Sequence, residues 1–362
     1  MEEGINGQTG EEIIDVVSPE NQPVPGYMQF FKQRQEQIIW FLQEQSDIDT
    51  YAKIAAEMAE TITNEGEPVV NLIKLASQFG VKRIIYCNNE PTGQYNGHYG
   101  GGSQLIRILY DPQYYSKNDR FLQETLAHEI GHAVLSYFGV SYNHNYRHFS
   151  QQEMFAQVFA RTLLLPDRLI QRLLSQTGYT VDEQGNLQYR KGEYPLLHQN
   201  ELPPQTGLRA VLHLIKYIHE TQNIPLFLIV KRLQEFGILQ DRTIVLTRIG
   251  NKIKQETYCP NDWGGNSDYA TINTHLTLEN LGLDPKQFLE GDHEMTPDFM
   301  VIYEDTMGDR MAHNIRIVSK ALPNYRTTVI IIQNTHGARI IDLPEMARQQ
   351  NDWGQSSRDI FG

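Results

Sequence analysis

Cysteine is scarce in this chain of 362 residues, with Cys87 and Cys259 as its only two. Two cysteines exclude a disulfide framework and any metal site built from four cysteines. Any metal ion must therefore be held by histidine and carboxylate side chains. Long apolar runs are also missing, because the longest, near 224–230, spans about seven residues against the ~20 needed to cross a bilayer. The acidic N-terminus shows no secretory signal, so we expect a cytoplasmic protein without a membrane segment.

Positive charge is the second deficit of the sequence. Lysine and arginine total 31 against 44 aspartate and glutamate residues, which gives a formal net charge of −13 at pH 7. A surface this acidic argues against general binding to nucleic acid or anionic membranes. The charge is uneven, since residues 1–25 hold six acidic and no basic side chains, whereas 205–256 hold eight basic and four acidic ones. We expect residues 1–25 to form a disordered acidic tail, because so polar a segment buries little apolar surface.

Periodicity divides the remaining chain into parts of different character. The length predicts roughly two domains of ~150 residues each. Apolar residues at helical spacing, interrupted by short β-branched runs, predict an α+β domain over 26–204. Five helices are expected: one from Met28, one through 52–58, one from Pro68 to Gly80, one over 119–138 and one over 151–165. Asp119 is the expected cap of the fourth helix. Strands are expected at 81–87 and 105–110, and a glycine-rich loop at 91–103.

The helix predicted over 119–138 carries the one motif with clear chemistry. It contains His128, Glu129 and His132 in the order His-Glu-x-x-His. Residues four apart lie one helical turn apart, so both imidazoles project from one face and can bind one metal ion, with Glu129 beside them. The alternative is a solvated helix face that carries two histidines by chance. The amphipathic flanks, and the space that Gly131 leaves for a close neighbour, favour the metal site.

A third metal ligand must come from outside this motif, because a catalytic zinc ion takes three protein ligands and leaves one position for water. Leu135 and Phe138 stand where the longer metzincin motif needs glycine and histidine, so that class is excluded. The remaining candidates are Glu153, His144 and His148. We favour Glu153, because it opens the next predicted helix and its carboxylate can point back at the histidines. His144 and His148 belong to a predicted loop, where solvent-facing or substrate-facing roles are the alternative.

The motif and the segment after it resemble the ImmA/IrrE family of bacterial and phage regulatory metallopeptidases. The matching residues are His128-Glu-Ile-Gly-His132 and the pattern Glu153-x-x-Ala156-x-x-Phe159-Ala160, followed by three leucines and Pro166. A weaker match covers residues 67–81, upstream of the motif. Together these matches span about residues 50–240, roughly half of the chain.

This resemblance implies a minimal zincin-like metallopeptidase fold with His128, His132 and Glu153 as metal ligands and Glu129 as general base. It also implies cleavage of a specific partner protein, such as a helix-turn-helix transcriptional repressor. In metal-assisted peptide hydrolysis an activated water attacks the carbonyl, and a base such as Glu129 takes up its proton and returns it to the leaving amine. Zinc suits these ligands best, and Mn²⁺ and Fe²⁺ accept the same donors.

Further side chains near the motif are candidates for supporting roles. Gln157 occupies a position where the family usually has asparagine or aspartate, and such a residue can support a liganding histidine through a hydrogen bond. The local donors for an oxyanion, with no choice made among them, are Tyr142, His144, Tyr146 and His148. The strand predicted at 105–110 offers an edge to which an extended substrate peptide can pair.

The basic segment 205–256 suggests a rival function. Its pattern over 210–239 is typical of a helix, a short turn and a second helix, as in a helix-turn-helix, and its net positive charge suits DNA. A DNA-binding transcriptional or stress-response regulator with a structural metal site is therefore the alternative function. The second helix begins with the apolar run 225–230, however, where base-contacting side chains are polar. We favour a packed helical pair over one that contacts DNA.

Residues 257–362 hold 15 acidic and eight basic side chains and carry no motif of known chemistry. Strand-like runs at 299–303 and 327–332 flank a helical-looking stretch at 311–321, which predicts a separate C-terminal α/β domain. A sensor or regulatory role for this domain rests on analogy with the resembling family alone. Residues 258–268 are predicted to form a linker or loop.

Overall fold

The chain divides into two compact units, Met1–Leu239 and Gln240–Gly362. Both helices and sheets occur, so the predicted mixed α and β composition is confirmed. The domain divisions predicted after residues 204 and 256 do not coincide with the boundary between the two units, which follows Leu239. A computed structural model describes residues 4–6, 11–16, 24–44, 47–64, 70–88, 95–112, 119–140, 146–183, 186–189, 207–249, 252–258, 278, 281–295, 300–304, 310–322 and 327–339.

The first unit contains a five-stranded sheet with the order β1-β2-β3-β5-β4. Its strands are β1 (Gly4–Asn6), β2 (Glu11–Asp15), β3 (Arg83–Cys87), β4 (Tyr95–Gly100) and β5 (Leu105–Tyr110). β3 and β5 run parallel, and the other neighbours run antiparallel. Ile84, Ile106 and Ile108 of the two central strands are fully buried. The strands predicted at 81–87 and 105–110 are therefore confirmed as the middle of this sheet.

The disordered tail predicted over residues 1–25 is wrong for β2. Ile13 and Ile14 pair with Ile85 and Ile84 of β3, and the Asp15 carboxylate bonds the Arg83 guanidinium at 2.8 Å. Short β-branched runs gain backbone hydrogen bonds and packing in a sheet. The high average charge of the first 25 residues concealed this local pattern.

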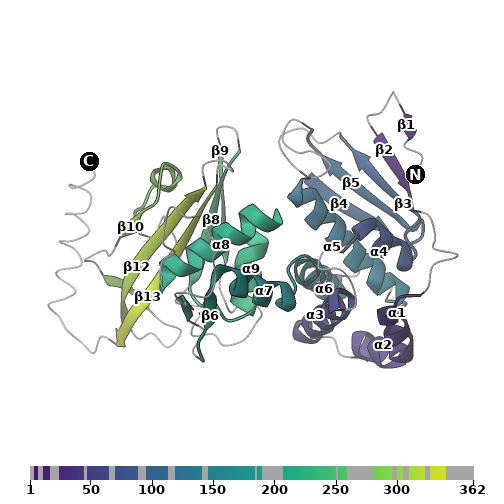
Figure 1. Cartoon of the computed structure of the whole chain (residues 1–362), viewed down its shortest axis with the longest axis horizontal. Helices are drawn as coiled ribbons and strands as arrows, with labels where there is room; N and C mark the ends of the chain where they lie inside the picture. The colour runs from purple at the N-terminus through teal and green to yellow at the C-terminus, as the bar shows by residue number, and fades with distance from the viewer. Residues whose placement is uncertain are drawn as a thin grey trace. The chain divides into compact units, whose positions relative to one another are not determined.

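Helices cover the sheet of the first unit and bring its metal-ligand candidates together. They are α1 (Gly26–Gln33), α2 (Gln35–Glu44), α3 (Ile48–Asn64), α4 (Leu72–Gln78), α5 (Arg120–Tyr137), α6 (Tyr146–Leu164) and α7 (Asp167–Thr177). α5 packs against β4 and β5 on one side and against α6 on another, and α3 lies along α6 (Figure 1). The helices predicted in this region are confirmed, with α6 beginning five residues before its predicted start.

The helical pair predicted over 210–239 is confirmed as α8 (Leu208–Gln222) and α9 (Leu226–Glu235). A short hairpin of β6 (Tyr179–Val181) and β7 (Leu187–Tyr189) precedes it. The prediction of a helical segment that extends to residue 256 is wrong. Residues beyond Leu239 belong to the second unit, where alternating β-branched side chains favour strands over helix.

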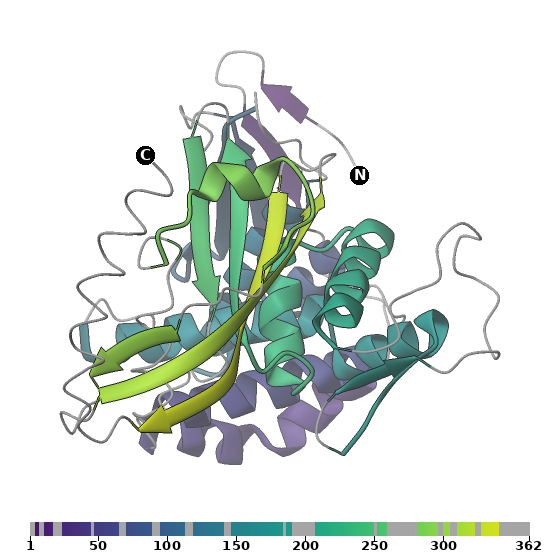
Figure 2. The same cartoon turned by 90° about the vertical axis from the view of Figure 1, so that its left-hand side faces the viewer.

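The second unit is built on an antiparallel sheet with the order β10-β12-β13-β8-β9, and β11 pairs with β12. The strands are β8 (Arg242–Ile249), β9 (Lys252–Tyr258), β10 (Glu294–Met295), β11 (Met300–Glu304), β12 (Arg310–Leu322) and β13 (Thr327–Arg339). The short 3-10 helix η1 (Pro285–Leu289) lies across the sheet (Figure 2) and buries Phe288 against Ile317 and Ile330.

Two of the three elements predicted for the C-terminal region are confirmed. The strand-like runs at 299–303 and 327–332 correspond to β11 and the start of β13. The helix predicted at 311–321 is wrong, because these residues form β12, which pairs with β13 along nearly its whole length. Cross-strand pairing outweighed the weak local helix preference. Most of the loop predicted at 258–268 lies outside the described residues.

Candidate metal centre

Helix α5 sets the spacing of the two histidines. It begins after Asp119, whose carboxylate accepts a hydrogen bond from the backbone N–H of Phe121 at 2.9 Å, so the predicted cap is confirmed. His128 and His132 lie one turn apart, and their ring centroids are 4.8 Å apart. The imidazole of His132 is 5% exposed and that of His128 17% exposed. The helix therefore presents both rings to the protein interior.

A glycine brings the second ligand-bearing helix close. A Cβ atom at Gly131 would lie only 2.8 Å from the Cα of Ala156 and 3.2 Å from its Cβ. α5 and α6 thus touch through the backbone at this point, which only glycine opposite a small residue permits. Glu153 precedes Ala156 by nearly one turn of α6, so this contact carries its carboxylate to the histidines. Gly131 and Ala156 thus fix how closely the Glu153 carboxylate approaches the two imidazoles.

The donor groups of His128, His132 and Glu153 form a compact triangle. The Nε2 atoms of the two histidines are 3.2 Å apart, and each lies 3.3 Å from a different oxygen of the Glu153 carboxylate, Oε2 for His128 and Oε1 for His132. Ligand atoms at ~2.0–2.1 Å from a tetrahedral zinc ion are ~3.3–3.4 Å apart, so these contacts have the length that a shared metal ion requires. His128, His132 and Glu153 can therefore hold a metal ion, in agreement with their selection from the sequence.

The protonation equilibria of the three groups are coupled. Burial lowers the pKa of His132, whereas at His128 the hydrogen bond to Glu153 and the neighbouring carboxylates outweigh burial and raise the pKa. Burial alone would raise the pKa of Glu153, but hydrogen bonds from both imidazoles lower it well below its ordinary value. The Glu153 carboxylate is thus held as an anion between the two imidazoles. A carboxylate must be in this charge state to bind a metal cation.

Glu129 lies beside the edge strand β4. Its side chain is buried, and burial raises its pKa to about 7, although the charge of His128 and a hydrogen bond from the backbone of Tyr99 act in the opposite direction. A Cβ atom at Gly97 would overlap the carboxylate of Glu129 and come within 2.7 Å of Thr125 Cγ2. The loop predicted at 91–103 is therefore wrong at 95–100, where a glycine-containing strand is needed so that its backbone can approach Glu129.

The other predicted site residues are placed less fully. Tyr142 and His144 lie outside the described residues, and Tyr146 and His148 belong to the first turns of α6, where the side chains are not described. Gln157 is exposed, and no hydrogen bond joins it to either histidine within the described residues. Among the described side chains, Glu153 is thus the candidate third ligand whose donor atoms lie beside both imidazoles.

Two residues near the metal-ligand candidates, Glu124 and His98, were not predicted from the sequence. Glu124 lies one turn before His128, and its charge contributes to the raised pKa of that histidine. His98 on β4 is close enough for its charge to add to the lowering of the His132 pKa by burial. The spacing from Glu124 to His128 was a usable signal for the first. None existed for His98, since its glycine-rich surroundings favoured a loop.

A buried ion-pair network fixes α9 to the rest of the first unit. The Arg232 side chain is 6% exposed, and its guanidinium bonds Asp167 at 2.6 Å, Glu235 at 2.7 Å and the backbone oxygen of Leu165 at 2.9 Å. Glu60 of α3 lies 3.5 Å away. Leu226, Leu228, Ile229, Val230, Leu233 and Gln234 of α9 are also buried. The apolar start of α9 and the Arg232 side chain are therefore occupied by contacts within the first unit.

Comparison with known proteins adds no relative. No protein-family model matches the chain, and a search of curated proteins gives no match. The resemblance to the ImmA/IrrE family therefore remains a prediction carried by the residues quoted above. Among the described residues, no helix is both long enough and apolar enough to span a membrane.

Proposed function

We propose that the first unit is a metal-dependent peptidase whose metal is held by His128, His132 and Glu153. The observation that carries the proposal is the triangle of donor groups, in which the two imidazoles lie 3.2 Å from each other and each lies 3.3 Å from one oxygen of the Glu153 carboxylate. Three protein ligands leave one position for water or substrate, as catalytic zinc sites do. The adjacent buried carboxylate of Glu129 is the second element of the proposal.

Zinc is the metal we propose, because two imidazoles and one carboxylate are a frequent catalytic zinc set, and Mn²⁺ or Fe²⁺ are the alternatives. A bound metal would polarise the scissile carbonyl as a Lewis acid and would make a water molecule more acidic. Glu129 would be the group that takes up a proton on its carboxylate and donates it to the leaving amine. The backbone of Tyr99 orients this carboxylate, and burial keeps its proton affinity near the working range.

The edge of the sheet provides a place for the substrate backbone. The prediction that the strand at 105–110 offers a free edge is wrong, because β5 is paired on one side with β3 and on the other with β4. Within the described residues, the edge strands of this sheet are β1 and β4, and β4 is the one that lies beside Glu129. An extended peptide added along β4 would place a scissile bond next to Glu129. By the family resemblance, we propose a helix-turn-helix repressor as the substrate protein.

Metal analysis and cleavage together test this function. The purified chain, loaded with Zn²⁺ and dialysed, should retain one metal ion per chain, and His128→Ala should lose it. His293→Ala, which changes a histidine of the second unit, is the matched control and should retain the metal. Glu129→Gln should also retain the metal but should not cleave a repressor encoded beside this gene.

Two results would contradict the proposal. A chain that retains no stoichiometric metal would remove the basis of the site. Undiminished cleavage by a metal-loaded Glu129→Gln variant would remove the role of Glu129. Promoter DNA binding that depends on salt and is unaffected by Glu129→Gln would instead support the rival regulator function.

A further inference from the structure

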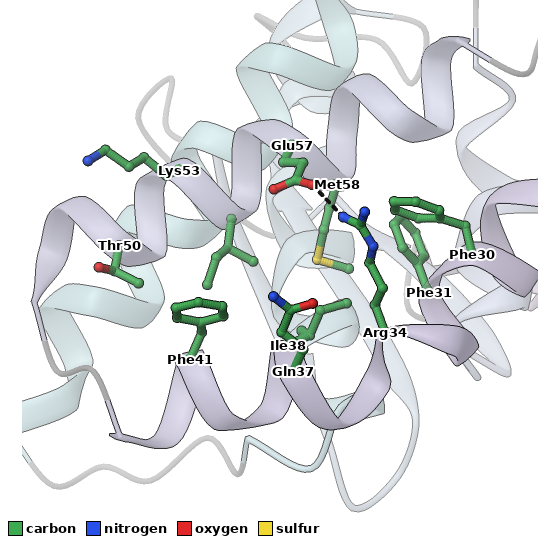
Figure 3. Close-up of a pocket in the computed structure, with 11 residues that line it drawn as sticks. Phe30, Phe31, Arg34, Gln37, Ile38, Phe41, Thr50, Lys53, Glu57 and Met58 are labelled. Atoms are coloured by element: carbon green, nitrogen blue, oxygen red, sulfur yellow. Dashed lines mark hydrogen bonds and ion pairs between the residues drawn. The ribbon is translucent and has the colours of Figure 1, made fainter.

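A cavity lies on the first unit, and none of the metal-ligand candidates lines it. It has a volume of about 250 Å³ and is bounded by α1 and α2 on one side and by α3 on the other (Figure 3). Its lining is Phe30, Phe31, Arg34, Gln37, Ile38, Phe41, Thr50, Lys53, Ile54, Glu57 and Met58. We call it the α2–α3 groove. None of these residues belongs to the proposed peptidase site.

The interior of the α2–α3 groove is apolar and aromatic. Phe31 and Met58 are buried and form its floor, and Figure 3 shows the sulfur of Met58 between the flanking aromatic rings. Phe30 lies at one end and Phe41 at the other. A protein cavity of about 150 Å³ accommodates benzene, so about 250 Å³ is enough for one aromatic ring with a short side chain. The groove is therefore sized for a small ligand.

A cation stands at the rim. The guanidinium of Arg34 lies 4.3 Å from the centroid of the Phe30 ring, and its Nη1 bonds Glu57 Oε1 at 3.2 Å. The two side chains are 49% and 64% exposed, and ion pairs this exposed contribute little to stability. Stacking on Phe30 holds the guanidinium in place, while most of its five N–H donors are not used by Glu57.

The charge of the rim selects an anionic group. Arg34 is the cation that faces the groove, between Phe30 and Glu57. Lys53 also belongs to the lining, but its charge acts on Asp47 and Figure 3 shows its ammonium group pointing away from the cavity. A ligand carboxylate can replace Glu57 at the guanidinium, with a planar, two-pronged geometry that arginine favours. An apolar ligand without a charge would leave this cation unused.

We propose that the α2–α3 groove binds a small amphipathic carboxylate, whose ring or short alkyl chain lies between Phe30 and Phe41 and whose carboxylate pairs with Arg34. This site is independent of the proposed peptidase function. α3, which forms one wall of the groove, also packs along α6, the helix that carries Glu153. A ligand in the groove therefore contacts a helix next to the metal-ligand candidates without entering their site.

Calorimetric titration of the full chain with two probes of equal shape tests the proposal. 3-Phenylpropionate should bind with a Kd on the order of 1 mM, as suits a ligand of about ten non-hydrogen atoms. 3-Phenylpropanamide, which lacks the charge, should bind about tenfold more weakly. Arg34→Gln should abolish this difference by weakening the acid about tenfold and leaving the amide unchanged. Arg83→Gln, which removes an exposed, ion-paired arginine from β3, is the matched control and should bind both probes as the wild type does.

A second variant separates the groove from the charge. Ile38→Trp fills the cavity and should abolish binding of both probes, while circular dichroism and the melting temperature verify that the variant is folded. Binding of the acid that survives Ile38→Trp in a folded protein would overturn the location. Equal affinity for acid and amide in the wild type would overturn the carboxylate assignment. Absence of saturable binding of either probe at 10-fold the expected Kd would overturn the site as a whole.

Discussion

Replacing Gly131 with alanine tests whether the contact between α5 and α6 fixes the donor triangle. The added Cβ would lie 2.8 Å from Ala156 Cα and 3.3 Å from the Ala156 carbonyl oxygen. Carbon atoms in ordinary contact are ~3.5–4.0 Å apart, so the two helices must separate locally by roughly 0.7–1.2 Å. The Glu153 carboxylate moves with α6. Its distances of 3.3 Å to the two imidazoles should then increase to about 4 Å.

Two measurable quantities should change in Gly131→Ala. Overpacking costs about 1–3 kcal/mol, and the better helix propensity of alanine offsets about 1 kcal/mol, so we expect a net loss of up to about 2 kcal/mol in the free energy of unfolding. Zinc affinity should decrease on the order of 10–100-fold, because the ligands no longer lie at bonding separations. Urea denaturation of the metal-free chain gives the first quantity, and competition with a chromophoric chelator gives the second.

Matched variants test whether the contact between Gly131 and Ala156 causes these changes in stability and zinc affinity. In Gly101→Ala the new Cβ would lie 3.5 Å from Ser136 Oγ, an ordinary contact, so stability should change by less than about 0.5 kcal/mol. Adding Ala156→Gly to Gly131→Ala should recover only part of the loss, because the nearest atom is the Cα of residue 156 and remains. Wild-type stability and zinc affinity in Gly131→Ala would refute the reasoning.

The remaining predictions concern separate parts of the first unit. Gly97→Ala should reduce the proposed cleavage at least ~10-fold without loss of metal, because its Cβ displaces Glu129; cleavage assays with parallel metal analysis test this, and unchanged cleavage would contradict it. Arg232→Met should cost about 3 kcal/mol in urea denaturation by leaving buried acids unpaired, whereas Lys216→Met, which breaks an exposed pair with Glu220, should cost less than about 0.5 kcal/mol. Burial and the nearby charge of Arg120 lower the pKa of His219 to about 4, so the unfolded chain binds the proton first. Stability should therefore fall by about 3 kcal/mol as the pH decreases from 6.5 to 4, and His219→Gln should remove this component of the pH profile.

The sequence predicted the parts of the site that depend on local spacing. His128 and His132 lie on one helical face because they are four residues apart, and a cap and an apolar stripe identified the helix. The pairing of the histidines needed no knowledge of tertiary contacts, since helix geometry alone fixes which side chains share a face. Glu153 was selected because it opened the next predicted helix, but α6 begins at Tyr146, and the contact of Gly131 with Ala156 is what brings Glu153 to the histidines.

Two strands that depend on pairing with a neighbour were not predicted. β4 reads locally as a glycine-rich loop, and β12 reads locally as a helix, yet each pairs antiparallel with the strand that follows it in the chain. Strand preference reflects packing against neighbours more than intrinsic backbone tendency, so such segments are ambiguous in isolation. The same reasoning applies to α9, where the pattern predicted a helix, but only the contacts of Arg232 show which side of it is covered.

The placement of two histidine ligands and the proposed base on one helix explains why α5 meets its neighbours through a glycine on two sides, Gly131 of α5 itself and Gly97 of β4. Successive residues of an α-helix are rotated by ~100°, so Glu129 projects from a different face than His128 and His132, which are ~40° apart. The histidines meet α6 across Gly131, whereas Glu129 meets β4 across Gly97. A disturbance on the α6 side therefore alters the donor triangle, whereas one on the β4 side alters only the carboxylate of Glu129. Gly131→Ala should for this reason reduce metal retention, and Gly97→Ala should reduce proton transfer without loss of the metal, although Glu129 and His132 are only three positions apart in the sequence.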